Sequence, residues 1–191
     1  MKKALRRSLA VLLILVVSIG LGYCGSVVWD GVERGSFPLK YSEFVDSASE
    51  SFGVPRRVIY ATIKVESNFD ASAKSSAGAI GLMQITPATF EEISAKLGDH
   101  YEQGMMFDPE TNIRYGTYYL GYLYKYFGDW EIVFAAYNAG MGNVSAWLDD
   151  PEYTDDNGKL VNIPYKETEN YVKKIKDAEL KYLELYPQNI K

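Results

Sequence analysis

The sequence predicts an all-α fold. Apolar residues recur with the 3.6-residue period of a helix in one segment after another, and no segment keeps the two-residue alternation of a half-buried strand. Prolines and capping side chains open these segments, and glycines close them. With 47% apolar and 24% charged residues, the 191-residue chain has the composition of an ordinary globular domain and not that of a disordered one.

The first two helices of the domain follow from this pattern. Apolar side chains between Tyr41 and Phe52 lie on one helical face, and Gly53 stops that helix. Pro55 stands where a first-turn proline belongs and opens the second helix. Glu66 extends the apolar stripe of the second helix, whose other members are Val58, Ile59, Thr62 and Ile63.

N-terminal caps define the later helices. Thr86, Asp108 and Asp129 each precede a periodic apolar segment and can accept hydrogen bonds from the free amides of its first turn. A proline follows Thr86 and Asp108 at the first helical position, where its missing N–H costs nothing. We expect helices over residues 86–97, 108–127, 129–139, 143–148 and 167–186.

The connectors between these helices are not expected to bind a metal. The chain has one histidine, His100, which we interpret as a loop residue, and one cysteine. Residues 149–162 are acidic, but placing Gly158 at the sixth position of a calcium-binding EF-hand loop puts Tyr153 and Pro164 where acids are needed. We therefore predict a solvated turn there, and neither a metal site nor a cofactor.

The first 29 residues are predicted to be a separate element. Four basic residues precede the uncharged run 9–29, which as a helix would be about 31 Å long, close to the thickness of the hydrocarbon layer of a membrane. We favour an uncleaved membrane anchor over residues 1–29, with the basic end in the cytoplasm and the remainder outside. Residues 30–40 are then a linker, and residues 41–187 form the extracytoplasmic domain.

Two other interpretations of the N-terminal segment stay open. Its strongly apolar core is short enough for a cleaved signal peptide. Cys24 also lies in a motif that looks like a lipid-attachment site, although Tyr23 stands where a small residue is expected.

The charge beyond Trp29 excludes one class of partner. This part holds all 25 acidic residues and 16 basic ones, so its net charge is near −9. Nucleic-acid binding relies on basic side chains that neutralise phosphates. We expect no nucleic-acid partner.

Glu66 is the strongest candidate for a catalytic residue. A glutamate on a core-facing stripe is unusual, because ionised side chains are rarely buried alone. Burial and the negative end of the helix dipole both disfavour the anion, so both raise its pKa. A glutamate that keeps its proton near neutral pH can act as a general acid. The alternative is a carboxylate at a helix end that turns out to solvent.

The segment after Glu66 resembles the first motif of the soluble-type lytic transglycosylases, which share the goose-type lysozyme fold. Glu66-Ser67, Ser75 and the run GAIGLMQ at residues 78–84 match in order and spacing. AYNAG at residues 136–140 resembles the second motif, and residues 167–172 resemble the third. One position departs from the pattern, since Thr86 stands where many members have methionine. The three motifs cover nearly the whole domain.

The resemblance implies a lysozyme-like helical domain with a catalytic cleft. Glu66 would be the catalytic residue, and the Tyr171 hydroxyl would form a hydrogen bond with it. Tyr137 and Asn138 would line the cleft. The other residues expected to bind or support the substrate are Ser75, Met83 and Gln84. The alternative for both tyrosines is packing in the helical core.

The reaction implied by the resemblance is cleavage of peptidoglycan glycan strands between N-acetylmuramic acid and N-acetylglucosamine, with a 1,6-anhydro ring as product. One glutamate would act first as acid and then as base. Asp70 is the candidate second carboxylate of a hydrolase, but the helix is expected to end near Ser67, and the matching position in the family is not catalytic. A hydrolytic muramidase of the same fold and an inert glycan-binding module are the alternatives. Expected partners are glycan strands and the membrane, with other cell-wall machinery as a further candidate.

Overall fold

The computed structural model describes residues 17–23, 28–29, 31–100, 102–155 and 157–190. The chain divides into two compact units, one ending at Pro38 and the other beginning at Leu39. In the first unit, residues 17–23, 28–29 and 31–36 are helical. Within the described residues, no helix is both long and apolar enough to cross a membrane. Much of the membrane helix predicted for residues 9–29 lies outside the described residues.

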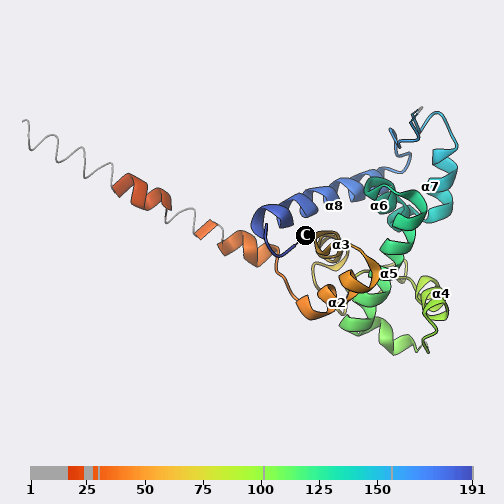
Figure 1. Ribbon diagram of the computed structural model, residues 1–191, viewed down its shortest axis with the longest axis horizontal. Helices are drawn as coiled ribbons and strands as arrows, with labels where there is room; N and C mark the ends of the chain where they lie inside the picture. The colour runs from red at the N-terminus through yellow and green to blue at the C-terminus, as the bar shows by residue number, and fades with distance from the viewer. Residues whose placement is uncertain (1–16, 24–27, 30, 101, 156, 191) are drawn as a thin grey trace, which may run out of the picture. The chain divides into compact units, whose positions relative to one another are not determined.

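The second unit is helical, as predicted, and the residues described in it include no strand, only isolated β-bridges (Figure 1). The elements are α2 (Ser42–Phe52), α3 (Arg56–Ser67), α4 (Pro87–Leu97), the 3-10 helix η1 (Gln103–Phe107), α5 (Pro109–Phe127), α6 (Trp130–Ala139), α7 (Met141–Leu148) and α8 (Lys166–Leu185).

The predicted N-terminal caps are confirmed. The Thr86 side chain accepts a hydrogen bond from the amide of Thr89, Asp108 accepts one from Thr111, and Asp129 accepts one from Glu131 and another from the next amide. Two boundaries differ from the prediction. The connector before α5 contains η1, and α7 begins at Met141 and not at residue 143, because Gly140, with φ of 90°, turns the chain directly from α6 into α7.

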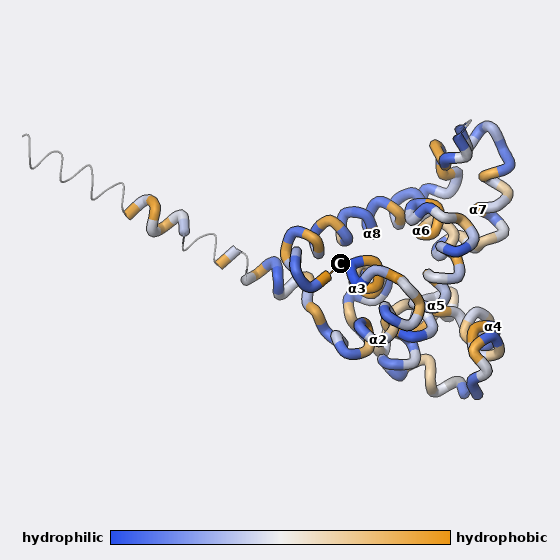
Figure 2. The backbone as a smooth tube through the Cα atoms, in the orientation of Figure 1, coloured by the Kyte–Doolittle hydropathy of each residue, from blue (hydrophilic) through white to orange (hydrophobic). Residues whose placement is uncertain are grey.

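Helix α8 packs along α3, and α6 contacts α5, α7 and α8. The Tyr60 and Tyr182 rings lie 5.4 Å apart at the α3–α8 contact, and Arg57 Nε donates to Glu179 at 2.6 Å beside them. Hydrophobic and hydrophilic residues alternate along α8 (Figure 2), and its apolar stripe is buried. Because α3 carries Glu66 at its end, this packing fixes which residues of α8 face that carboxyl.

Candidate active site

Glu66 and Tyr171 meet where the end of α3 faces α8. Glu66 is half-buried in the last turn of α3, and Tyr171 is buried in the second turn of α8. The Tyr171 hydroxyl donates to Oε1 of Glu66 at 2.6 Å. The hydrogen bond that the sequence resemblance implied is therefore present.

The surroundings of Glu66 hold its carboxyl near the midpoint of its titration at neutral pH. Burial raises the pKa of Glu66 to about 7, and the hydrogen bond from Tyr171, which favours the anion, offsets part of that rise. Burial also raises the pKa of the Tyr137 and Tyr171 hydroxyls well above the usual value, and the neighbouring Glu66 adds to the effect. Both tyrosines therefore stay protonated. A carboxyl with such a pKa can both give and take a proton near pH 7.

The loop between α3 and α4 is held to α3 next to this carboxyl. The Ser67 hydroxyl, one residue after Glu66, donates to the Leu82 carbonyl at 2.8 Å. The Ile80 and Ile85 backbones exchange hydrogen bonds of 3.0 and 3.1 Å, which closes the tip of the loop. Gly81, with φ of 81°, makes the turn between them.

Ser75 and Gln84 bind the backbone of this loop. Ser75 Oγ accepts from the Ala79 amide at 3.0 Å. The Gln84 side-chain amide donates to the Ala73 carbonyl at 3.2 Å and to the Gly81 carbonyl at 2.9 Å. These bonds shape the loop, and Gln84 also lines the pocket described next. Neither residue has a described hydrogen bond to Glu66.

A pocket of about 250 Å³ lies between this loop, α4, α5 and α6. Tyr137 and Asn138, predicted to line a cleft, are in its wall, and the Tyr137 ring lies 5.4 Å from the Tyr119 ring. The Asn138 side-chain oxygen accepts from the Thr168 hydroxyl at 2.8 Å, which leaves the Asn138 amide hydrogens available as donors. The other lining residues are Gln84, Ile85, Thr86, Thr89, Tyr119, Ala139 and Gly140.

The Met83 side chain was expected to contact the substrate, but it is buried in the core. That side chain is 0% exposed, and a Cβ added at Gly116 of α5 would lie 2.8 Å from Met83 Cβ. Met83 therefore fills the core behind the loop. What Met83 offers to the site is its carbonyl oxygen, which accepts the Tyr137 hydroxyl at 2.8 Å.

The Asp70 side chain forms its hydrogen bonds with Ser72 and not with Glu66. It is exposed beyond the end of α3, where its Oδ1 accepts from the Ser72 amide at 2.9 Å and from the Ser72 hydroxyl at 2.6 Å. These bonds lower the pKa of Asp70, so it remains an anion bound to its own turn. Of these two carboxyls, Glu66 is therefore the one whose pKa is raised into the range that general acid catalysis near neutral pH requires.

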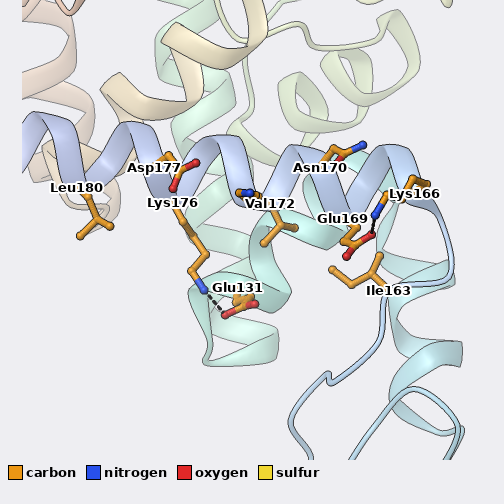
Figure 3. A pocket seen from close by; sticks show the side chains of 10 residues that line it. Glu131, Ile163, Lys166, Glu169, Asn170, Val172, Lys176, Asp177 and Leu180 are labelled. Carbon is orange, nitrogen blue, oxygen red and sulfur yellow. Dashed lines mark hydrogen bonds and ion pairs between the residues drawn. The ribbon is translucent and has the colours of Figure 1, made fainter. Parts of the chain in front are cut away.

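A larger pocket, of about 450 Å³, lies along the exposed face of α8 (Figure 3). Its acidic and basic side chains are equal in number, and two pairs are joined: Lys176 with Glu131 at 2.7 Å and Lys166 with Glu169 at 2.6 Å. It contains none of the residues predicted for the site. The smaller pocket near α6 is the one that contains residues predicted for the site, namely Gln84, Tyr137 and Asn138.

The structure also locates residues that sequence reasoning missed. Tyr119 is one of six tyrosines on α5, and no local pattern distinguishes it from the other five. Thr168 was noted as part of a motif, but its bond to Asn138 joins two helices and has no local signal. Asn112 is fully buried in α5 and binds the loop backbone. Among the described residues, no group of three or more His, Cys, Asp and Glu side chains is placed to hold a metal ion.

The half-buried carboxyl of raised pKa and the pocket of aromatic and amide side chains lie in one helical domain, which agrees with the lysozyme-like class that the sequence resemblance implied. Residues 43–159 match the Transglycosylase SLT domain. The chain is 38% identical over 152 residues to the soluble lytic murein transglycosylase of Escherichia coli strain K12, covering 78% of this chain and 23% of that protein. The chain belongs to the family of transglycosylases that carry the SLT domain.

Two further comparisons agree. Over 135 residues the chain is 35% identical to the membrane-bound lytic murein transglycosylase C of Edwardsiella ictaluri, covering 65% of this chain and 36% of that protein. The crystal structure of the 70 kDa soluble lytic transglycosylase of Escherichia coli superposes with a TM-score of 0.73 at 33% identity, covering 83% of this chain and 27% of that one. The chain thus spans about a quarter to a third of the length of these relatives.

Proposed function

We propose that this chain cleaves peptidoglycan glycan strands as a lytic transglycosylase, forming 1,6-anhydro-N-acetylmuramic acid ends. The observation that carries the proposal is the state of Glu66. Its pKa is raised to about 7, and Tyr171 holds one of its oxygens at 2.6 Å. A single carboxyl with a pKa near the working pH is suited to two opposite proton transfers. Family membership supports the same reaction.

In the first step, protonated Glu66 gives its proton to the oxygen that links N-acetylmuramic acid to N-acetylglucosamine. The bond from C1 of the muramic acid to that oxygen breaks, and the N-acetylglucosamine side leaves with a free hydroxyl. The acetamido oxygen of the muramic acid assists by supplying electron density to C1. Tyr171 contributes in this step by bonding the carboxylate that forms.

In the second step, the Glu66 carboxylate takes the proton from the C6 hydroxyl of the same muramic acid as that oxygen bonds to C1. The acetamido oxygen is released, the anhydro ring closes and Glu66 regains its starting state. No water is consumed. The absence of a role for Asp70 agrees with this scheme, because Asp70 is bound to Ser72 and does not provide a second carboxylate beside Glu66.

We assign the glycan to the pocket beside α6. The Tyr137 and Tyr119 rings offer apolar faces for pyranose rings, and Asn138 offers donors for acetamido oxygens. Gln84 lines the pocket and forms a hydrogen bond with the loop backbone at Ala73. Ser75 stabilises the same loop by accepting a hydrogen bond from the Ala79 amide. Met83 acts through its carbonyl bond to Tyr137.

The products of digestion test the reaction. Purified peptidoglycan is incubated with the full chain in mild detergent, and the released muropeptides are weighed by mass spectrometry. We expect anhydro products, each lighter by one water than the product of hydrolysis. Hydrolysed ends would establish a muramidase of the same fold. Intact strands with retained binding would establish a glycan-binding module. Glu66→Gln is the matched control, because it keeps the shape of the side chain and cannot deliver the proton.

For topology, we propose that residues 1–29 form a single membrane anchor, residues 30–40 a linker, and residues 41–187 the catalytic domain outside the cytoplasm. The support is the basic start and the uncharged run 9–29 of the sequence. A relative named as membrane-bound also exists. Peptidoglycan as a substrate requires the domain to lie outside the cytoplasmic membrane. Cleavage of the segment and lipidation at Cys24 are the alternatives.

A further inference from the structure

Asn112 is a fully buried polar side chain that forms hydrogen bonds with the backbone of the loop between α3 and α4 and with the backbone of η1. It lies in the first turn of α5 and is 0% exposed. Its Oδ1 accepts from the Met83 amide at 2.8 Å, and its Nδ2 donates to the Ile80 carbonyl at 3.0 Å and to the Met106 carbonyl at 2.8 Å. The side chain thus uses both amide hydrogens and one oxygen lone pair on backbone groups.

The bonds of Asn112 continue directly to the pocket wall. Asn112 binds the amide of Met83, and the carbonyl of the same residue accepts the Tyr137 hydroxyl at 2.8 Å. Tyr137 lines the pocket and lies close enough to Glu66 for the Glu66 charge to raise its pKa. Two bonds through one residue therefore connect a buried amide on α5 with the aromatic wall beside the candidate catalytic carboxyl.

The packing around Asn112 leaves the loop little freedom to take another path. A Cβ added at Gly81 would lie 2.8 Å from Asn112 Cγ and 2.6 Å from the Met106 carbonyl oxygen. On the other side, Met83 fills the space above Gly116, one helical turn after Asn112. The loop backbone is therefore in direct contact with α5 at Gly81 and Met83, and Asn112 supplies the polar partners for that contact.

We propose that Asn112 is a positioning residue for glycan cleavage, which sets the place of Tyr137 by fixing the Met83 peptide groups. Asn112 does not contact substrate, and its effect on the reaction passes through the Met83 carbonyl to the Tyr137 hydroxyl. The proposal rests on the proposed function, because it concerns the geometry of the same site. It predicts coupling between two residues, Asn112 and Tyr137, that have no bond to each other.

A double-mutant cycle on cleavage tests this coupling. Asn112→Ala, Tyr137→Phe and the double variant are compared with wild type, using kcat/KM per folded molecule. Tyr137→Phe removes only the hydroxyl that binds Met83. We expect Asn112→Ala to lower kcat/KM by about tenfold or more in the wild-type background and by less than about threefold in Tyr137→Phe, since residues in one network are not additive. Equal losses in both backgrounds would overturn the proposal.

Two controls separate positioning from simple loss of stability. Thr117→Val changes another fully buried polar residue of α5, whose hydroxyl has no partner among the described residues, and should leave kcat/KM unchanged. Leu120→Ala opens a cavity in the same helix and should lower the melting temperature without lowering kcat/KM per folded molecule. A loss of kcat/KM in Leu120→Ala as large as in Asn112→Ala would overturn the proposal, because any weakening of α5 would then have the same effect.

Gly81→Ala provides a second route if Asn112→Ala does not fold. Its Cβ would push against the Asn112 side chain from the loop side, so it should show the same coupling to Tyr137→Phe. Additivity of Gly81→Ala with Tyr137→Phe would count against the proposal as strongly as in the first cycle.

A readout that needs no cleavage keeps the two proposals distinguishable. Amide hydrogen exchange at Met83, followed by NMR, should be slow in wild type and much faster in Asn112→Ala or Gly81→Ala, with exchange in the α8 core unchanged. A wild-type chain that cleaves no glycan contradicts the proposed function. Slow Met83 exchange in both variants contradicts the role of Asn112, whether or not the wild type cleaves.

Discussion

The Tyr171 hydroxyl donates to Oε1 of Glu66 at 2.6 Å across 105 residues of sequence. The bond connects the last turn of α3 with α8 and acts against the burial that raises the pKa of Glu66. Burial alone would keep the carboxyl protonated to higher pH, and a fully solvated glutamate would lose its proton near its ordinary pKa of 4.5. The balance between these effects places the pKa of Glu66 near neutrality.

Replacing the candidate catalytic carboxyl should abolish turnover and leave the fold intact. Glu66→Gln keeps the shape of the side chain and can still bond Tyr171, but it cannot transfer a proton. We expect kcat to fall at least about 10²-fold, the usual contribution of general acid–base catalysis. Glycan binding, measured by calorimetry, should persist. Turnover near the wild-type value would remove Glu66 from the mechanism.

Removing the hydroxyl of Tyr171 should slow the reaction and change its pH dependence. The hydroxyl lowers the pKa of Glu66, so Tyr171→Phe raises that pKa. Because the first step needs protonated Glu66, the basic limb of the kcat/KM profile should move to higher pH. Melting temperature should change little, since the ring remains. A large fall in melting temperature with unchanged activity per folded molecule would show that Tyr171 acts only in packing.

Glu66 should also make stability depend on pH in a defined window. Its pKa is raised from 4.5 to about 7 on folding, so folding takes up a proton between these values. The folded state is favoured below about pH 4.5 and loses this contribution as pH rises through about 7. The upper bound on the loss is about 3 kcal/mol, from the size of the shift. Urea unfolding of wild type and Glu66→Gln from pH 4 to 9 measures it; parallel stability curves would contradict the raised pKa.

The Thr168 hydroxyl should matter for glycan binding through Asn138. Thr168→Val removes the donor that holds the Asn138 oxygen, and the amide then loses its fixed orientation toward the pocket. We expect kcat/KM to fall about 3- to 10-fold, the value of one ordinary hydrogen bond. Thr154→Val is the matched control, because its hydroxyl binds the Trp147 carbonyl away from the pocket. An equal loss in both variants would remove the specific role of Thr168.

The N-terminal segment should stay on the mature protein. If residues 1–29 are an uncleaved anchor, the cell-associated chain keeps its full mass, and detergent releases it from membranes where high salt does not. Intact-mass spectrometry of the membrane fraction measures this. A form beginning near residue 25 without added mass would indicate a signal peptide, and a lipid-modified form beginning at Cys24 would indicate a lipoprotein.

The helices could be predicted because their signals are local. The caps at Thr86, Asp108 and Asp129, and the glycines after the helices, act within one or two turns of chain. The bond between Glu66 and Tyr171 was expected only from the family resemblance, because nothing in the sequence near either residue indicates the other.

The residues that sequence reasoning missed act over long distances in the sequence. Asn112 binds Met83, 29 residues earlier, and Thr168 binds Asn138, 30 residues earlier. Met83 was predicted to contact the substrate because it belongs to the first motif of the family. Its apolar side chain is buried, however, and its backbone carbonyl is the group that bonds Tyr137. A motif identifies the segment that reaches the site, and packing decides which atoms of that segment are presented.

The placement of Tyr171 on α8 also determines when, during synthesis of the chain, the surroundings of Glu66 are complete. α8 follows every other helix of the domain, and the Ile190 carbonyl beyond it accepts from the Arg57 amide at 3.2 Å, fastening the end of the chain to the start of α3. A chain that has emerged only as far as residue 165 contains Glu66 and the whole 66–87 loop but lacks the Tyr171 hydroxyl. The hydrogen bond between Tyr171 and Glu66 can therefore form only after α8 has been synthesised.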